Sequence, residues 1–184
     1  MKRTKILTVL LFAVCSILLS ANLHSKGKSY TFSDYDIGVK LTFPSIFREQ
    51  PKYDGEDGRE YNVHFELDKP FYNDITDPML VYRKQSNMDY SYLSMRNSLY
   101  ISESITIDDL LEHARAYSSE AKEIKKIGKD ACSFIIPNFY FGLSLICYCK
   151  VHNGAIHSFM IRCQQWQIDK YKPYIKQLSI NFIN

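Results

Sequence analysis

The sequence contains no apolar run long enough to cross a membrane as a helix. Its one long apolar stretch, Ile6 to Leu19, has about 14 residues, whereas a spanning helix needs about 20. Three basic residues precede this stretch and small residues follow it. That order is typical of a secretory signal peptide. We therefore predict that residues 1–25 are a cleaved signal peptide, and that the mature chain is secreted or periplasmic, without a transmembrane segment.

Cysteine is scarce, with five residues in a chain of 184. Cys15 lies inside the apolar stretch, but a lipid-modified cysteine prefers a small residue before it, and Val14 is not small. We therefore do not expect a lipoprotein anchor at Cys15, although an uncleaved anchor remains an alternative. The other four are too few for a disulfide-rich scaffold: Cys132, Cys147, Cys149 and Cys163.

Net charge is also small. The chain has 23 basic and 20 acidic residues, and loss of the first 25 residues would leave 20 of each. A neutral mature chain gives no argument for binding nucleic acid or an anionic membrane. We therefore predict no nucleic-acid partner.

Catalytic motifs are missing. The sequence has no G-x-S-x-G elbow, no H-E-x-x-H pair and no phosphate-binding glycine loop. Carboxylate pairs need not be close in sequence, so a general acid and base remain possible. We predict no catalytic residue, no cofactor and a non-enzymatic protein.

Alternating apolar residues predict several strands, and apolar residues at helical spacing predict two helices. The clearest helix is Thr106 to Ala121, where Thr106 and Asp109 resemble a capping box. A second helix should start near Asp169, because Pro173 is tolerated only in a first turn. The predicted strands include Tyr30–Ser33, Ile37–Phe43, Tyr61–Leu67, Met79–Arg83, Lys122–Ile127, Ala131–Ile136, Phe139–Val151, Ala155–Cys163 and Ile180–Phe182.

The paired cysteines Cys147 and Cys149 lie in a strand, and their side chains share an apolar face. We interpret them as core residues, with a disulfide or a soft-metal or redox pair as alternatives. A three-residue loop, His152-Asn153-Gly154, would place Phe159 opposite Cys147. A two-residue turn at Pro137-Asn138 would place Cys132 opposite Leu143, and Cys163 would lie opposite Leu143 from the other side. Cys132 and Cys163 would then be about 9.5 Å apart, too far for a bond.

Two further groups of residues are candidates for binding. His64 and Glu66 share one face of a strand, but no third ligand accompanies them, so we interpret this face as solvated and predict no metal site. The segment 68–104 is rich in tyrosine, and exposed tyrosines make good contact surfaces. The weak candidate binding residues are Tyr72, Tyr90, Tyr92 and Tyr100. The alternative is that these tyrosines cover the edge of the core.

The order of motifs resembles the PsbP-like and DcrB-like α/β domain families, over roughly residues 30–184. The similar features are the strand Gly38–Ser45, the helix with an I-x-x-L-L pattern, two strands around a Gly-Lys turn, the His-Asn-Gly turn and the tail Lys170–Phe182. The resemblance implies an α+β fold in which helices flank a central antiparallel sheet, a PsbP-like α/β/α sandwich. It implies one domain, residues 26–184, and an accessory role in binding larger partners.

Two hypotheses about function follow. The first is an exported, non-enzymatic accessory or binding domain whose partner is another envelope protein. The alternative is a small-ligand-binding or hydrolytic envelope protein with a site in segment 68–104. An exposed aromatic patch would favour the first, and a compact polar pocket would favour the second.

Overall fold

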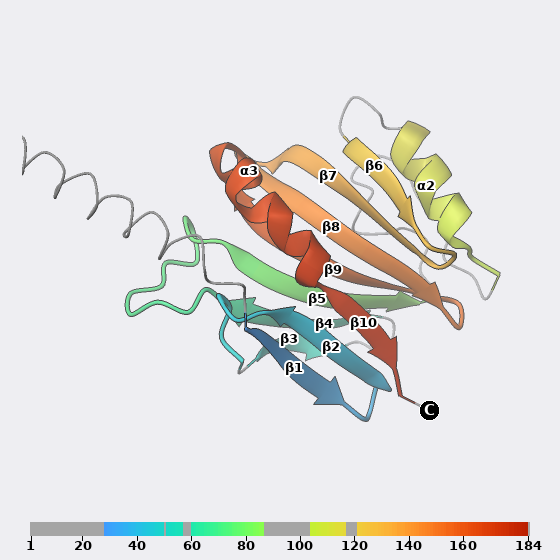
Figure 1. Cartoon of the computed structure of the whole chain (residues 1–184), viewed down its shortest axis with the longest axis horizontal. Coiled ribbons are helices and arrows are strands. Elements are labelled where there is room, and N and C mark those ends of the chain that lie inside the picture. Colours follow the sequence, from blue (N-terminus) through green and yellow to red (C-terminus); the bar gives the residue numbers. More distant parts are fainter. Residues whose placement is uncertain (1–27, 50, 57–59, 87–103, 117–120, 184) are drawn as a thin grey trace, which may run out of the picture.

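The structure is a computed structural model that describes residues 28–49, 51–56, 60–86, 104–116 and 121–183 (Figure 1). Residues 1–25 with Cys15, and also Tyr90, Tyr92 and Tyr100, lie outside the described residues. The signal peptide, the export and the binding roles of these tyrosines therefore stay predictions.

The described residues form two antiparallel sheets. In the smaller sheet, β2 (Val39–Pro44) lies between β1 (Ser29–Asp34) and β10 (Ser179–Phe182). The larger sheet has seven strands in the order β3 (Lys52–Glu56), β4 (Glu60–Glu66), β5 (Met79–Ser86), β9 (Ala155–Gln164), β8 (Leu143–His152), β7 (Ala131–Tyr140) and β6 (Lys122–Ile127).

The helical elements are short. The longest described helix, α2, covers Ile107–Ala116. After β9, the chain forms the 3₁₀ turn η1 (Gln165–Gln167), α3 (Ile168–Tyr171) and the 3₁₀ segment η2 (Lys172–Gln177). Pro173 lies in the first turn of η2, as its missing N–H group requires. The helix predicted near Asp169 is therefore present, but as three short pieces.

The two faces of the larger sheet are covered differently. The smaller sheet, α3 and η2 cover one face, and Figure 1 shows α3 and β10 in front of it. Alternate residues of β2, among them Leu41 and Phe43, are fully buried against this face. On the opposite face, Leu110 and Leu111 of α2 pack against residues of β7 and β8 such as Phe134.

The predicted helix-flanked α/β/α sandwich is wrong. Strands make up 55% of the described structure and helices 17%. The physical reason lies in β1 and β2, which do not join the central sheet. β1 pairs with β2, β2 pairs with β10, and these three strands occupy a layer that the prediction assigned to helices. The proline in η2 also limits α3 to four residues.

The β8–β9 hairpin differs from its predicted register. His152 pairs with Ala155, so the loop has only two residues, Asn153 and Gly154, both with positive φ (47° and 68°). An Asn-Gly pair favours such a turn, because both residues tolerate the left-handed conformation. Cys147 consequently opposes Met160 and not Phe159. Both faces of β8 and β9 are buried over most of their length, so alternation could not select the register.

The β7–β8 turn also differs from its prediction. It lies at Phe141–Gly142, because β7 continues past Pro137 with a shift in register. Cys132 therefore opposes Cys149 and not Leu143.

The four cysteines of the described chain are free and buried, which confirms the core interpretation. Cys163 belongs to the core under the smaller sheet, whereas the other three belong to the core under α2. The sheet itself therefore separates Cys132 from Cys163. Burial raises the pKa of the Cys163 thiol to about 11.

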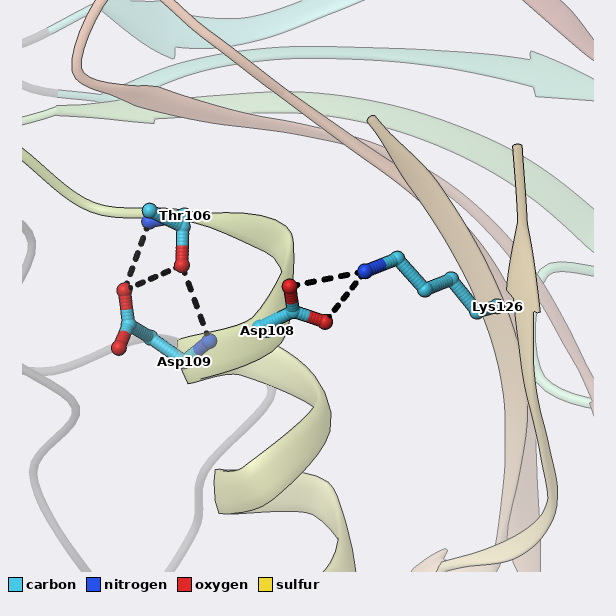
Figure 2. A network of polar contacts seen from close by, with 4 residues as sticks. All are labelled: Thr106, Asp108, Asp109 and Lys126. Atoms are coloured by element: carbon cyan, nitrogen blue, oxygen red, sulfur yellow. Dashed lines mark hydrogen bonds and ion pairs between the residues drawn. The ribbon is translucent and has the colours of Figure 1, made fainter. Parts of the chain in front are cut away.

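The predicted capping box of α2 is confirmed (Figure 2). The backbone N–H of Asp109 donates to Thr106 Oγ1 (3.3 Å), and the backbone N–H of Thr106 donates to Asp109 Oδ2 (2.8 Å). Beside this cap, Lys126 of β6 forms an ion pair with Asp108 at 2.5 Å. The start of the helix is thereby fixed to the edge strand of the larger sheet.

Replacing Thr106 with alanine is expected to lower the free energy of unfolding by about 1 kcal/mol, because the N-cap acceptor is lost. Chemical denaturation of the purified protein measures this. Asp108→Ala is the matched control, since an exposed ion pair contributes at most about 1 kcal/mol and usually less. An unchanged free energy of unfolding for Thr106→Ala would show that the cap does not stabilise the helix.

Candidate functional site

One end of the larger sheet carries a group of exposed apolar side chains. We call this group the apolar end: Phe71, Ile75, Phe141 and Trp166, with exposed fractions of 90%, 73%, 86% and 80%. They belong to three connections, namely the β4–β5 loop, the β7–β8 turn and η1. These connections meet because Met79 pairs with Arg162, and Arg162 with Leu145, which aligns the strand ends.

Hydrogen bonds connect the three segments of the apolar end. The backbone N–H of Gln165 donates to the carbonyl of Gly142 at 3.0 Å. Arg162 Nη2 donates to the carbonyl of Asp74 at 2.9 Å, and Gln164 Nε2 reaches the carbonyl of Ile75 at 3.4 Å. The end of β9 is thus bonded to the backbone of both neighbouring loops, which holds the three segments together.

Phe141 has an unfavourable backbone conformation. Its φ is 43°, in the left-handed region that large side chains rarely adopt. Strain of this kind persists at sites where the surrounding structure or a function requires it. Here the surrounding structure is the two-residue turn between β7 and β8, in which Phe141 and Gly142 both have positive φ.

The other exposed large apolar residues of the described chain lie elsewhere. Tyr35 (79%) follows β1 and Ile127 (41%) ends β6, at the opposite end of the sheets. Single exposed apolar residues are ordinary, whereas a group of them marks an interaction surface.

Tyr72, the one predicted binding residue within the described chain, lies in the β4–β5 loop and is only partly exposed. Its hydroxyl oxygen is buried and has no hydrogen-bond partner among the described residues. Burial raises the pKa of Tyr72 to about 12, with Arg162 opposing this and Glu66 adding to it. The loop is closed beside it by a 2.6 Å ion pair between Lys69 and Asp77, whose hydrogen bond lowers the pKa of Asp77.

Tyr72→Phe is expected to leave the free energy of unfolding unchanged or to raise it by up to about 1 kcal/mol, because an unpaired buried hydroxyl is removed. Tyr82→Phe is the matched control and should lower it by about 1–2 kcal/mol, since Tyr82 shares a hydrogen bond with His157 Nδ1 at 2.8 Å. Thermal denaturation of both variants tests this. A marked loss for Tyr72→Phe would mean that its hydroxyl has a bonding role.

A second feature is a hollow on the α2 side of the larger sheet, with a volume of about 100 Å³. We refer to it as the hollow. It lies where β4, β5, β9 and β8 run side by side, and its lining residues are Asn62, His64, Met79, Val81, Arg83, Leu145, Met160 and Arg162. The predicted solvated face of His64 and Glu66 is wrong for Glu66. His64 lines the hollow, whereas Glu66 is buried and its carboxylate is bound by Arg48 at 2.9 Å.

A buried polar network lies at the opposite end of the sheets. His157 of β9 is 3% exposed, and burial lowers its pKa to about 3, with Lys84 adding to the effect. Its neighbour His152 stacks on Phe182 of β10, with ring centroids 3.7 Å apart. Because His157 is enclosed between the two sheets, this network acts in stability and does not form a surface site.

The sequence did not point to the apolar end or to the arginines of the hollow. The available signal was the occurrence of Phe71 and Trp166 in predicted connections, where large apolar residues have no core to enter, whereas Phe141 was assigned to the predicted strand Phe139–Val151. Arg83 and Arg162 interrupt otherwise apolar strands. Neither signal predicts where these residues lie in space, because only the pairing of strands that are distant in the sequence brings them together.

No protein-family profile matches this chain, and no curated protein does. Among solved structures, the chain is similar to the solution structure of cyanobacterial PsbP from Synechocystis sp. PCC 6803. The two are 11% identical, with a TM-score of 0.45, over 85% of this chain and 93% of that one. This is a similarity of fold, and no inference about function rests on it. The likeness to DcrB-like domains stays a prediction.

Within the described ranges, no helix has the length and apolar character needed to span a membrane.

Proposed function

We propose that this chain is an exported, non-enzymatic accessory domain that binds another protein through its apolar end. The observation that carries the proposal is the convergence of four exposed apolar side chains from three bonded connections. A few large aromatic residues commonly supply most of the binding energy at protein interfaces. The neutral charge of the predicted mature chain agrees with recognition by apolar contacts.

The surroundings of the apolar end favour a protein over a lipid surface. Asp74 adjoins Ile75, and Asp169, whose side chain is 96% exposed, lies three residues after Trp166. Lys170 lies next to it. An apolar centre with a polar rim of both charges is typical of a protein interface. An anionic membrane surface would repel the two carboxylates.

The bonded loops also support the proposal. Hydrogen bonds from Gln165 to Gly142 and from Arg162 to Asp74 hold the backbone of the connections in place before binding. Less conformational entropy is then lost on association, which increases affinity for a given contact area.

Site-specific photo-crosslinking in the producing cells tests the proposal. A photoreactive phenylalanine analogue replaces Phe141 or Trp166, and Tyr35 is the control position, since it is a similarly exposed aromatic residue at the opposite end. We expect a discrete protein adduct from positions 141 and 166 and none from position 35. Phe71→Asp, introduced as a second change, should weaken the adduct at position 141 severalfold.

Three outcomes would contradict the proposal. One is the absence of an adduct at positions 141 and 166. Another is the same adduct from position 35. The third is crosslinking to lipid alone, which would assign the apolar end to a membrane surface. The mature N-terminus, read from the envelope fraction, separately tests the predicted export and cleavage.

A further inference from the structure

We propose that Cys132 and Cys149 are a redox pair, which a thiol oxidant joins by a disulfide between β7 and β8. This inference does not depend on the apolar end or on the hollow. It rests on the observed strand register, which places two free cysteines of the described chain directly opposite each other.

The backbone geometry of this pair suits a disulfide. Cys132 pairs with Cys149, and two positions farther along the same ladder the backbone N–H of Val151 donates to the carbonyl of Asp130 at 3.1 Å. Hydrogen-bonded pairs recur at every second position of an antiparallel ladder, with Cα atoms about 5.5 Å apart. Cys132 and Cys149 therefore form such a pair, and this Cα distance lies within the roughly 4.4–6.8 Å found across disulfides.

The two thiols also meet on the same face of the sheet. Cys132 and Cys149 are fully buried in the core under α2. Burial raises the pKa of the Cys149 thiol, and a hydrogen bond with Cys132 adds to this effect. Because a hydrogen bond between thiols requires adjacent sulfur atoms, the disulfide needs little rearrangement of the two strands.

The other free cysteines of the described chain are badly placed to compete. Cys147 lies diagonally across from Cys132, and such diagonal neighbours are roughly 7–8 Å apart, too far for a bond. Cys147 and Cys149 are two residues apart on one strand, so their parallel side chains are separated by about 6.6 Å. The Cβ atoms of a disulfide are only roughly 3.5–4.5 Å apart. Cys163 belongs to the core on the opposite face of the sheet.

The oxidant is the disulfide of another molecule, such as oxidised glutathione or an oxidised thiol oxidoreductase. The thiolate of one cysteine attacks the oxidant, forms a mixed disulfide and releases one thiol. The thiolate of the other cysteine then attacks this mixed disulfide, which forms the Cys132–Cys149 bond and releases the second thiol. In total, the two cysteines lose two protons and two electrons, and the S–S bond of the oxidant is reduced to two thiols.

Burial determines when this exchange takes place. Both side chains are fully enclosed in the folded chain, so the oxidant has to react before the core closes over them. The opposed Cβ atoms of paired strands are roughly 4.5–5.5 Å apart, slightly more than in a relaxed disulfide. The bond is therefore expected to be strained and more easily reduced than a relaxed one. Export, which remains a prediction, would place the chain where disulfides persist.

Disulfide mapping of the refolded, full-length mature protein tests this inference. The protein is reduced and unfolded, refolded with reduced and oxidised glutathione, then unfolded again so that all remaining thiols are alkylated. Chymotrypsin cleaves after Tyr148 and thereby separates Cys147 from Cys149 for mass spectrometry. We expect the Cys132–Cys149 link to be at least about tenfold more abundant than any other link. The same oxidation in concentrated guanidinium chloride should give a mixture of links, because the strands are then unpaired.

Two variants test whether the register selects the pair. Cys147→Ala should retain the link, whereas Cys149→Ala should lose it and leave Cys132 alkylated. Both changes remove one fully buried thiol from the same core, which makes them a matched pair. If neither variant refolds, the map of the wild type decides alone. Alkylated Cys132 in the refolded wild type, a predominant link to Cys147 or Cys163, or the same single link from the denatured chain would each overturn the inference.

Discussion

Replacing Phe43 with alanine is expected to lower the free energy of unfolding by about 3–5 kcal/mol, the usual cost of truncating a buried phenylalanine. Phe43 is fully buried between the two sheets. Its ring centroid lies 4.3 Å from that of Phe65 on β4 and 6.5 Å from that of Phe159 on β9. The substitution therefore opens a cavity at the contact that joins the smaller sheet to the larger one.

Urea denaturation of Phe43→Ala beside Phe141→Ala measures this effect. Both changes remove the same ring, but Phe141 is 86% exposed, so its loss should alter the free energy of unfolding by no more than about 0.5 kcal/mol. If Phe43→Ala leaves too little folded protein to measure, Phe43→Leu provides a smaller change in the same direction. Equal stabilities for Phe43→Ala and Phe141→Ala would contradict the packing of the two sheets.

The second large expected effect is a loss of folding stability at acid pH. His157 has its pKa lowered from 6.5 to about 3, first by burial and then by the charges of Lys84, His152 and Lys150. Because the folded pKa lies below the unfolded one, the unfolded chain binds the proton more tightly between these two values. The folded state therefore loses stability as the pH falls below about 6.5, and the loss ends near the folded pKa.

Between pH 7 and pH 4.5 the loss from this one group is expected to be about 2.5 kcal/mol. The measurement is the free energy of unfolding against pH for the wild type and for His157→Gln. The variant lacks the titrating ring, so its curve should be flatter over this interval, although it will be less stable at neutral pH where the bond to Tyr82 is lost. Parallel curves would show that His157 does not titrate between the two states.

Some elements could be predicted from the sequence because one local signal was enough. Residues 61–67 alternate strictly, and β4 forms there. The capping residues Thr106 and Asp109 define the start of α2. In contrast, Lys52–Glu56 belongs to β3, although this stretch contains turn-forming and charged residues and no alternation. Pairing with β4 determines the extended conformation of β3, and the local sequence of β3 alone does not predict this pairing.

The arrangement of the elements was harder to predict. β1 and β2 alternate like any half-buried strands, and nothing in their sequence indicates that they form a separate sheet with β10. Strand pairing also determines both candidate sites. Arg83 and Arg162 share the hollow only because Met79 pairs with Arg162, a contact between residues far apart in the chain. The apolar end likewise depends on strand ends that meet after folding.

The central position of β2 in the smaller sheet has a consequence for synthesis. Leu41 pairs with Phe32 within a local hairpin, but its other neighbour is Ile180, which the ribosome adds only after the entire larger sheet. Contacts between such distant segments close slowly, and an unpaired strand edge invites wrong partners in the meantime. A growing chain would therefore expose one edge of β2 until β10 arrives, and this interval is when the nascent protein most needs a chaperone.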